Sequence, residues 1–244
     1  MPFASRIFRR SVRANMPIPP RPSTPLGSAS PKSTLSIYEA AAVSAICFGL
    51  FITWSTQAVL RGFPEARFSA SGHAWMVLVE AVLAAAALLY LSARNFDIPS
   101  LYPQPDVRGT VLGLGLFVAA WLAGAIAMAL FANPAGRSQM TEFSFSGVTL
   151  ASTVIFAMVN GAFEEVFLLG VLVRGLRGYG LSIAIGFPLL VRVLYHLYQG
   201  PLGAVWILVF GLTFTFFYVR SSRLWPAVFA HTLWDIVPVA IAGY

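Results

Sequence analysis

Charged residues are scarce in this sequence. Asp, Glu, Lys and Arg make up 10% of its 244 residues, whereas a typical soluble domain carries about 25%. Hydrophobic residues make up 58% of the chain, and its mean hydropathy is +0.76. This composition argues against an ordinary soluble domain and predicts a protein that crosses a membrane several times.

Cysteine and acidic residues are also rare. The single cysteine, Cys47, excludes an intramolecular disulfide. Sixteen basic residues against nine acidic ones give a net charge of +7. No basic groove interleaved with aromatic residues is visible, and the basic residues lie mainly at the ends of apolar runs, so we expect no nucleic-acid partner. Their placement instead suits a lipid bilayer with anionic headgroups.

Long apolar runs fill most of the chain after residue 36. Most have about the 20 residues that a helix needs to cross a bilayer. Lipid cannot satisfy backbone polar groups, and the alternation typical of a barrel strand is absent, so these runs should be helices. The sequence therefore predicts an all-α, polytopic transmembrane bundle of about seven spans, at 37–60, 72–93, 108–132, 148–173, 181–198, 202–219 and 223–242.

The basic residues predict the orientation of these spans. With the N-terminus in the cytoplasm, twelve Lys and Arg residues fall on the cytoplasmic side and three on the other side, as the positive-inside rule requires. Residues 1–35 are rich in Pro, Ser and Arg and should form a disordered basic cytoplasmic tail, followed by a transmembrane domain over 36–244. Arginine outnumbers lysine 15 to 1, which suggests a GC-rich bacterial genome and hence a multi-pass protein of the bacterial inner (plasma) membrane.

Ionisable residues inside the predicted spans are concentrated in the C-terminal half. Charges within a bilayer cost several kcal/mol, so few are kept without a role. The first three spans contain Glu39, which lies near a span end and could cap it, and Glu80, which could pair with another helix. The last four spans contain Glu164, Glu165, Arg192, His196, His231 and Asp235.

The spacing of these residues gives three helices one polar face each. Asn160 and Glu164, Arg192 and His196, and His231 and Asp235 are all i, i+4 pairs. Glu164 and Glu165 point about 100° apart on a helix, so one should face a reaction centre and the other a partner. Such pairs could simply hold helices together, but six residues on three helices favour convergence on one cavity.

This set of side chains suits hydrolysis by activated water. A buried carboxylate beside a neutral imidazole can take a proton from water, and donors on another helix can stabilise the oxyanion formed at a carbonyl. Zinc could be held by the same residue types. The sequence contains no H-E-x-x-H motif, so we expect no metal and no other cofactor.

Three segments resemble a known family. "EEVFLLG", "YHLYQG" and "LWPAVFAHTLWD" are similar to the motifs E-E-x-x-x-R, F-x-x-x-H and H-x-x-x-N of the CPBP family, the CAAX prenyl endoproteases and their bacterial Abi-type relatives. The resemblance covers about residues 145–240 and places Glu164, His196 and His231 in the three motifs, 32 and 35 residues apart. It implies that Glu164 and His196 activate water, that His231 and Asp235 occupy the oxyanion positions, and that Glu165 supports the site.

The chain departs from the family motifs at three positions. Leu169 replaces the arginine of the first motif and Arg192 the phenylalanine of the second, so the arginine could still pair with Glu165 from the neighbouring helix. Asp235 replaces the asparagine of the third motif. An ionised Asp235 would repel an oxyanion unless it is protonated, pairs with Arg192 or orients His231.

The predicted topology sets a further condition on the site. His196 lies near the outer end of its span, whereas Glu164 lies past the middle of its own. The two could meet only if the break at "QGPLG" (199–203) is sunk into the bundle, where a broken helix can line a wet cavity. We therefore favour a sunken break over a turn at the outer surface.

Two functions of different kinds fit these observations. The first is an intramembrane peptidase that acts on a hydrophobic or membrane-anchored peptide. The second is a non-catalytic CPBP-like membrane scaffold or self-immunity protein that binds a peptide or partner. A small proton-coupled transporter fits less well, because no internal repeat is visible. The sequence does not specify an oligomeric state.

Overall fold

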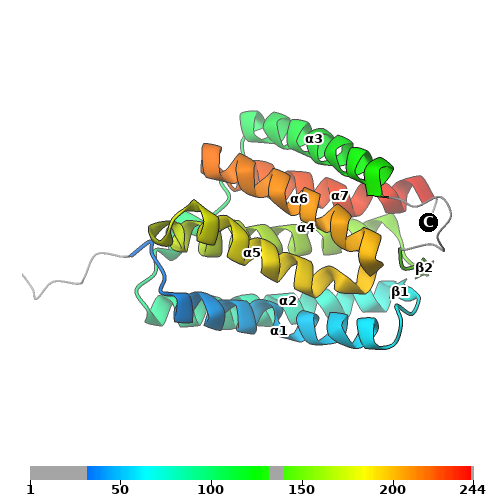
Figure 1. Ribbon diagram of the computed structural model, residues 1–244, viewed down its shortest axis with the longest axis horizontal. Coiled ribbons are helices and arrows are strands. Elements are labelled where there is room, and N and C mark those ends of the chain that lie inside the picture. The colour runs from blue at the N-terminus through cyan, green and yellow to red at the C-terminus, as the bar shows by residue number, and fades with distance from the viewer. Residues whose placement is uncertain (1–31, 132–139, 243–244) are drawn as a thin grey trace, which may run out of the picture. The chain divides into compact units, whose positions relative to one another are not determined.

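The computed structural model describes residues 32–131 and 140–242. In this part of the chain, seven α-helices alternate in direction, so that successive connections lie at opposite ends of the bundle (Figure 1). They are α1 (Ile37–Leu60), α2 (Ala70–Ala93), α3 (Val107–Phe131), α4 (Leu150–Glu165), α5 (Leu181–His196), α6 (Gly200–Ser221) and α7 (Trp225–Ala242). A π-helix, η2 (Val166–Val173), continues α4 without a break.

The helices fall within a few residues of the seven predicted spans, and the predicted all-α bundle is confirmed. Length and composition allow five continuous helical stretches of the described residues to cross a membrane. They are Ile37–Leu60, Ala70–Ala93, Val107–Phe131, Leu150–Val173 and Leu181–Ser221, the last containing both α5 and α6, while α7 is apolar but shorter. These are the helices of a multi-pass membrane protein; the number of crossings and the cytoplasmic N-terminus stay predictions.

The start of α1 is fixed by local polar contacts. Ser36 and Glu39 form a capping box, in which each side chain accepts a hydrogen bond from the backbone N–H of the other. Glu39 also pairs with Lys32 at 2.8 Å, so it has the capping role expected from the sequence. Leu35 is buried and its N–H bonds to the carbonyl of Gly175. Lys32 and Leu35, which belong to the predicted disordered tail, are therefore held by specific contacts, while residues 1–31 lie outside the described residues.

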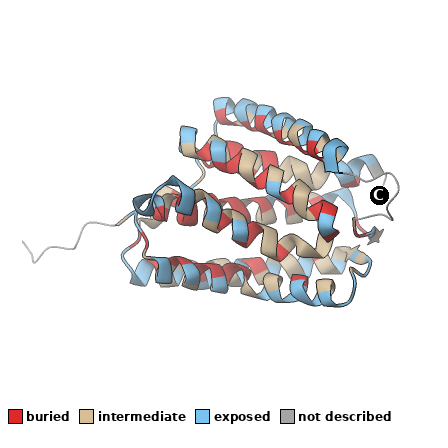
Figure 2. Ribbon diagram, viewed as in Figure 1, coloured by how far each residue is buried: buried red, intermediate tan, exposed pale blue. Residues whose placement is uncertain are grey.

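Two apolar clusters flank α4 and η2. One joins residues of α1, α2 and α5 to Leu168 and Leu172 of η2. The other joins residues of α3, α6 and α7 to Leu169 and Val173 of the same π-helix. Buried positions face the interior of this bundle, and exposed ones follow its outer faces (Figure 2). The polar residues of α4 consequently lie at the seam between two apolar layers.

The turn between α5 and α6, η4 (Leu197–Gln199), contacts both α1 and the segment just before β2. The N–H of Tyr198 donates to Ser55 Oγ of α1 at 2.9 Å, and the N–H of Thr141 donates to the carbonyl of Gln199 at 3.0 Å. The hydroxyl of Tyr195, near the end of α5, donates to Glu164. Glu164 is 14 residues into α4, about 21 Å along that helix. The end of α5 therefore lies close enough to α4 for Tyr195 to reach Glu164, and the depth of the break at 199–203 within a membrane stays a prediction.

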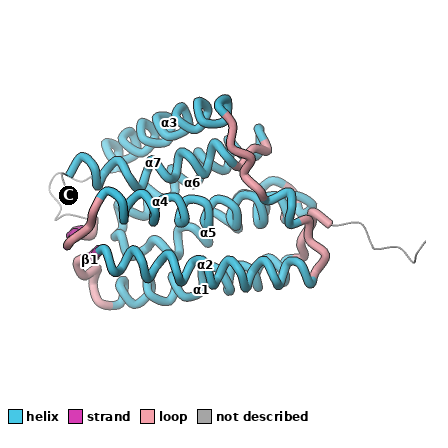
Figure 3. Tube along the Cα trace, turned by 180° about the vertical axis from the view of Figure 1, so that it is seen from behind, coloured by secondary structure: helices cyan, strands magenta, loops and turns pink. Residues whose placement is uncertain are grey.

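A short parallel strand pair was not predicted from the sequence. β1 (Ala66–Ser69) precedes α2, β2 (Phe143–Ser146) precedes α4, and they pair with Ala66 opposite Phe143 (Figure 3). The ring of Phe68 stacks on Phe143 and Phe145 at 5.9 and 5.4 Å between centroids. The pair joins two connections at the same end of the bundle, next to the cavity described below.

Two further short helices lie at the opposite end of the bundle. They are the 3-10 helices η1 (Ile98–Leu101) and η3 (Arg177–Tyr179). Arg174, just after η2, donates to Ser100 of η1 and pairs with Asp97 at 3.1 Å. These contacts connect the α2–α3 segment to the end of the π-helix.

Candidate active site

Three helices bring the predicted site residues together. α4 contributes Asn160, Glu164 and Glu165, α5 contributes Arg192 and His196, and α7 contributes His231 and Asp235. Close packing of α4 on α7 depends on Gly161. A Cβ atom there would lie 3.2 Å from the backbone nitrogen of Thr232 and 3.3 Å from the carbonyl of Val228. The glycine thus lets the two polar helix faces approach each other.

The two adjacent glutamates take the different positions expected from their angular separation. Glu164 lines a cavity, with 5% of its surface exposed, whereas Glu165 is fully buried and does not line it. The chain continues from Glu165 directly into the π-helix η2, and π-helical segments are frequent at functional sites.

Glu165 is held by two partners from two other helices. Arg192 Nη2 donates to Glu165 Oε1 at 2.8 Å, and His231 Nδ1 lies 2.6 Å from the same oxygen. Because a carboxylate oxygen accepts, His231 Nδ1 carries the hydrogen. The interhelical Arg192–Glu165 pair predicted from the sequence is therefore present. It also orients His231 from behind the cavity wall.

Aromatic and small residues of α6 accommodate the arginine. The Arg192 guanidinium lies 5.1 Å from the ring centroid of Phe210, a favourable arrangement for a cation. A Cβ atom at Gly211 would lie 3.0 Å from Arg192 Cδ and 2.7 Å from Leu189 Cδ1. Gly211 therefore leaves the space through which Arg192 reaches Glu165.

Glu164 has one direct donor and two more distant cationic or polar neighbours. The Tyr195 hydroxyl donates to Glu164 Oε2. Arg192 Nη1 and His231 Nε2 lie 3.8 and 3.9 Å from the same oxygen. One carboxylate oxygen is thus fixed by α5, and the side chain is held at the cavity surface.

Asp235 pairs with a residue that the sequence did not assign to it. Asn160 Nδ2 donates to Asp235 Oδ2 at 2.9 Å, and His231 Nε2 lies 3.8 Å from Asp235 Oδ1. No contact between Asp235 and Arg192 is present among the described residues. Of the three alternatives for Asp235, the ion pair with Arg192 is therefore excluded, and its proximity to His231 is compatible with an orienting role.

The ring of His196 is fixed in one tautomer by its own helix. Its Nδ1 lies 3.0 Å from the carbonyl oxygen of Arg192, and because a carbonyl can only accept, Nδ1 carries the hydrogen. In the neutral ring, Nε2 then keeps its lone pair. Tyr195 and Tyr198 flank the ring, at 4.4 and 6.2 Å between centroids. His196 is therefore arranged to accept a proton at Nε2.

One cavity of about 860 Å³ connects these groups. Five of the seven predicted site residues line it, namely Asn160, Glu164, His196, His231 and Asp235, while Glu165 and Arg192 lie behind its wall. Aromatic side chains from α1, β1 and α2, including Phe51, Trp54, Phe68 and Trp75, make up much of the rest. Two carboxylates, two imidazoles and an amide thus meet in a largely apolar chamber.

Two cavity residues were missed as site residues by the sequence analysis. Tyr195, which holds Glu164, immediately precedes His196 in the quoted "YHLYQG" segment, so its position was an available signal. Glu80 of α2 is 1% exposed and lines the cavity, and its Oε2 has no hydrogen-bond partner among the described residues. The sequence suggested that Glu80 pairs with another helix, but no such ion pair is present in the described part of the chain.

A metal could be held only by displacing existing contacts. Glu164, Glu165 and His231 each offer a ligand atom, all within 4.8 Å of one another. However, Glu165 Oε1 already accepts from Arg192 and His231, and Arg192 Nη1 lies 3.8 Å from Glu164. A divalent cation among these atoms would meet the guanidinium charge at close range. The residues therefore fit a zinc site poorly, and metal independence stays a prediction.

Comparison with known proteins agrees with the motifs. Residues 146–237 match the family model described as type II CAAX prenyl endopeptidase Rce1-like. No curated protein and no solved structure matches the chain. The match confirms the resemblance to the CPBP family and places this segment, which extends from the end of β2 into α7, in its Rce1-like group. The bacterial origin and the type of second motif stay predictions.

Proposed function

We propose that this chain, whose residues 146–237 form an Rce1-like segment of the CPBP family, is an intramembrane peptidase that hydrolyses a hydrophobic or membrane-anchored peptide. The observation that carries the proposal is the common cavity of Glu164, His196 and His231, from three separate helices. Its largely aromatic wall suits apolar side chains of a peptide, as in most sites that bind apolar ligands.

Water activation is assigned to Glu164 and His196. The carboxylate of Glu164 or Nε2 of His196 takes a proton from water as its oxygen attacks the peptide carbonyl carbon. A C–O bond forms and the carbonyl becomes an oxyanion. When this intermediate collapses, the C–N bond breaks, and the proton taken from water passes to the leaving amine. Water thus supplies OH to the new carboxyl group and H to the new amine.

The oxyanion donors are assigned to α7 and α4. His231 in its imidazolium form would donate from Nδ1 to Glu165 and from Nε2 into the cavity. The Asn160 amide gives one hydrogen to Asp235 and has a second one available. Asp235 would then orient two donors and need not face the oxyanion itself. This arrangement would supply the amide that the family motif has at position 235.

The proposal is tested on the purified protein reconstituted in lipid vesicles. The probes are two sets of hydrophobic peptides of identical sequence, one with and one without a C-terminal prenyl group, and products are identified by mass spectrometry. Hydrolysis should be lost in Glu164→Gln and in His196→Ala, with both variants inserted and folded. Thr213→Ala, on α6 and outside the cavity lining, is the control. Undiminished hydrolysis in Glu164→Gln would exclude this mechanism.

A non-catalytic peptide-binding protein is the second candidate. Asp235, which replaces the motif asparagine, is the observation that favours it, because an uncompensated carboxylate beside the reaction centre would oppose an oxyanion. Such a protein would bind the same peptides with similar affinity in the wild type and in Glu164→Gln, and neither would release products. Time-dependent product formation by the wild type alone would eliminate this candidate.

A further inference from the structure

We infer that the cavity opens on the non-cytoplasmic side of the membrane, so that the peptide it accepts is a segment of a membrane-anchored chain exposed on that side. That the ligand is a peptide rests on the proposed function, whereas the side on which the cavity opens is a separate property of the fold. It follows from two independent observations: where the cavity lies along the bundle, and where the basic residues lie.

The cavity belongs to one half of the bundle. Its lining residues come from the later parts of α1, α5 and α7, from most of the length of α4, and from the first halves of α2 and α6. All these helix segments adjoin the end that carries the β1–β2 pair (Figure 1). Its outermost lining residues include Pro64, Glu65 and Arg67, which are exposed in the α1–α2 connection. The mouth therefore lies at the strand end of the bundle.

The other end is closed by packed apolar side chains. Leu91, Phe96 and Leu101 from α2 and the segment after it pack in one cluster with Leu172 and Leu176 from the end of α4–η2. No cavity-lining residue comes from the α2–α3, α4–α5 or α6–α7 connections among the described residues. A peptide could thus enter from the strand end but not from this one.

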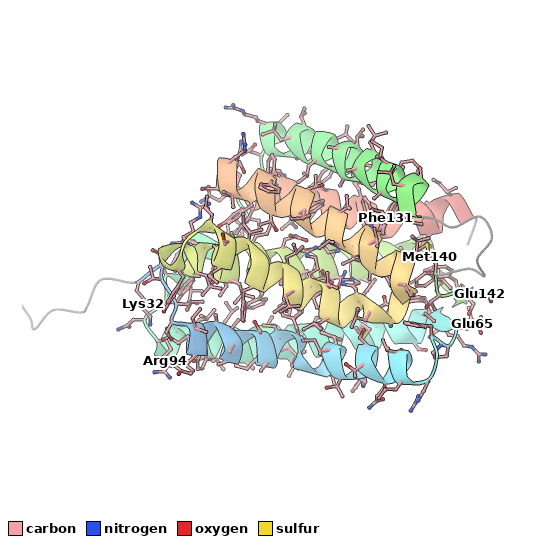
Figure 4. All side chains as sticks on the ribbon, in the orientation of Figure 1. Lys32, Glu65, Arg94, Phe131, Met140 and Glu142 are labelled. Carbon is pink, nitrogen blue, oxygen red and sulfur yellow. The ribbon has the colours of Figure 1, made fainter. Side chains whose placement is uncertain are left out.

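The basic residues are concentrated at the closed end. Figure 4 labels Lys32 and Arg94 at this end and Glu65 and Glu142 at the strand end. Of the described Lys and Arg residues outside the helix interiors, seven lie at or near the closed end, namely Lys32, Arg94, Arg108, Arg174, Arg177, Arg220 and Arg223. Two, Arg61 and Arg67, lie at the strand end.

This asymmetry fixes the side of the opening. Lys and Arg in short connections are retained in the cytoplasm, and acidic residues hardly alter the rule. The closed end is therefore cytoplasmic, even though Lys32, Arg174 and Arg223 pair with Glu39, Asp97 and Asp106. The strand end, and with it the mouth of the cavity, faces away from the cytoplasm.

The position of the site limits which peptide bonds can reach it. Glu164 lies about 21 Å along α4 from the strand end, and a fully extended chain covers at most about 3.5 Å per residue. A segment of about six residues could therefore span the distance from the mouth to Glu164. The peptide class is thus a membrane-anchored chain with at least several residues on the non-cytoplasmic side, able to extend inward along the aromatic wall.

Cysteine labelling in intact cells tests the direction directly. Cys47 is fully buried, so the wild-type chain should give no signal and serves as the background control. Glu65→Cys places a thiol at the mouth, and Gly178→Cys places one in the exposed α4–α5 connection, where a side chain would meet nothing within 4 Å. Both chains are exposed to a membrane-impermeant maleimide before and after permeabilisation of the cells.

The inference requires labelling of Glu65→Cys before permeabilisation and of Gly178→Cys only afterwards. The reverse order, or labelling of both before permeabilisation, would overturn it. Repeating the experiment in the Glu164→Gln background separates it from the proposed function, because labelling does not depend on catalysis. Correct labelling without any peptide hydrolysis would refute the peptidase and leave the direction of the opening established.

Discussion

Arg192 of α5 and Glu165 of α4 form a buried ion pair, with Arg192 Nη2 2.8 Å from Glu165 Oε1 and both side chains almost completely enclosed. His231 shares the same carboxylate oxygen. The pair therefore connects three helices at one atom. It lies behind the cavity wall, which Glu164, His196 and His231 line, and its carboxylate orients His231.

Removing the arginine should be costly. Arg192→Leu strands the Glu165 charge among apolar side chains, and breaking a buried pair from one side typically costs about 3–5 kcal/mol. We expect a lower midpoint of thermal unfolding in detergent and loss of activity. The double variant Arg192→Leu with Leu169→Arg restores an arginine four residues after Glu165 on the same helix and should recover part of the stability.

The matched control for this experiment is Leu169→Arg alone. Leu169 is 1% exposed and packs in the apolar cluster of α3, α6 and α7, so the single change should itself be destabilising. A double variant more stable than either single variant would show that the arginine can serve from either helix. An Arg192→Leu variant as stable as the wild type would show that the Arg192–Glu165 ion pair contributes nothing to the stability of the fold.

Asn160 and Asp235 should be exchangeable as a pair. Their side chains are joined by a hydrogen bond of 2.9 Å between α4 and α7. Asp235→Asn alone leaves two amides facing each other, and Asn160→Asp alone places two carboxylates together, so each should lower kcat and the second should also destabilise the fold. The double variant Asn160→Asp with Asp235→Asn restores one amide and one carboxylate.

The readout for this exchange is a double-mutant cycle on peptide hydrolysis. We expect the double variant to exceed Asn160→Asp in kcat, because an amide is again present near His231. If the effects of the two changes are simply additive, Asn160 is not the oxyanion donor. In that case Asp235 acts independently of it.

Much of this fold follows from the sequence because lipid leaves few alternatives. Backbone groups in a bilayer must bond within their own helix, so long apolar runs fix the helices to within a few residues. Ser36 and Glu39 mark the start of α1 through a capping box that can be recognised from spacing alone. The helix break at Gln199–Gly200 could likewise be recognised in the sequence. Its sunken position in the membrane was predicted only because Glu164 and His196 had to meet in one site.

The rest depends on contacts between residues far apart in the chain. The β1–β2 pair joins two four-residue segments, Ala66–Ser69 and Phe143–Ser146, and neither is long enough to show a strand pattern. The partner of Asp235 was not identified, because Asn160 lies on another helix, 75 residues away in the chain. Similarly, the polar character of Glu80 was evident, but not that α2 turns it toward the cavity.

Hydrolysis should not depend on a metal ion. Arg192 lies within hydrogen-bond distance of Glu165, the central member of the possible ligand set, and its charge disfavours a second cation there. Purified protein should contain less than stoichiometric zinc by elemental analysis and keep its activity after dialysis against a chelator. One tightly bound zinc ion per chain that is lost together with activity would reverse the assignment.

Replacing Glu80 by an apolar residue should stabilise the fold and weaken hydrolysis. It is 1% exposed, lies on the cavity wall, and has an Oε2 atom without a hydrogen-bond partner among the described residues. A buried polar group left unpaired costs about 1–3 kcal/mol. Glu80→Met fills a similar volume without that cost, so it should raise the midpoint of thermal unfolding, and it should weaken hydrolysis if Glu80 contacts the peptide.

The control is Glu142→Met, since Glu142 is exposed beside β2 and away from the cavity lining. A fall in the unfolding midpoint of Glu80→Met would instead mean that the carboxyl group is a structural partner within the bundle.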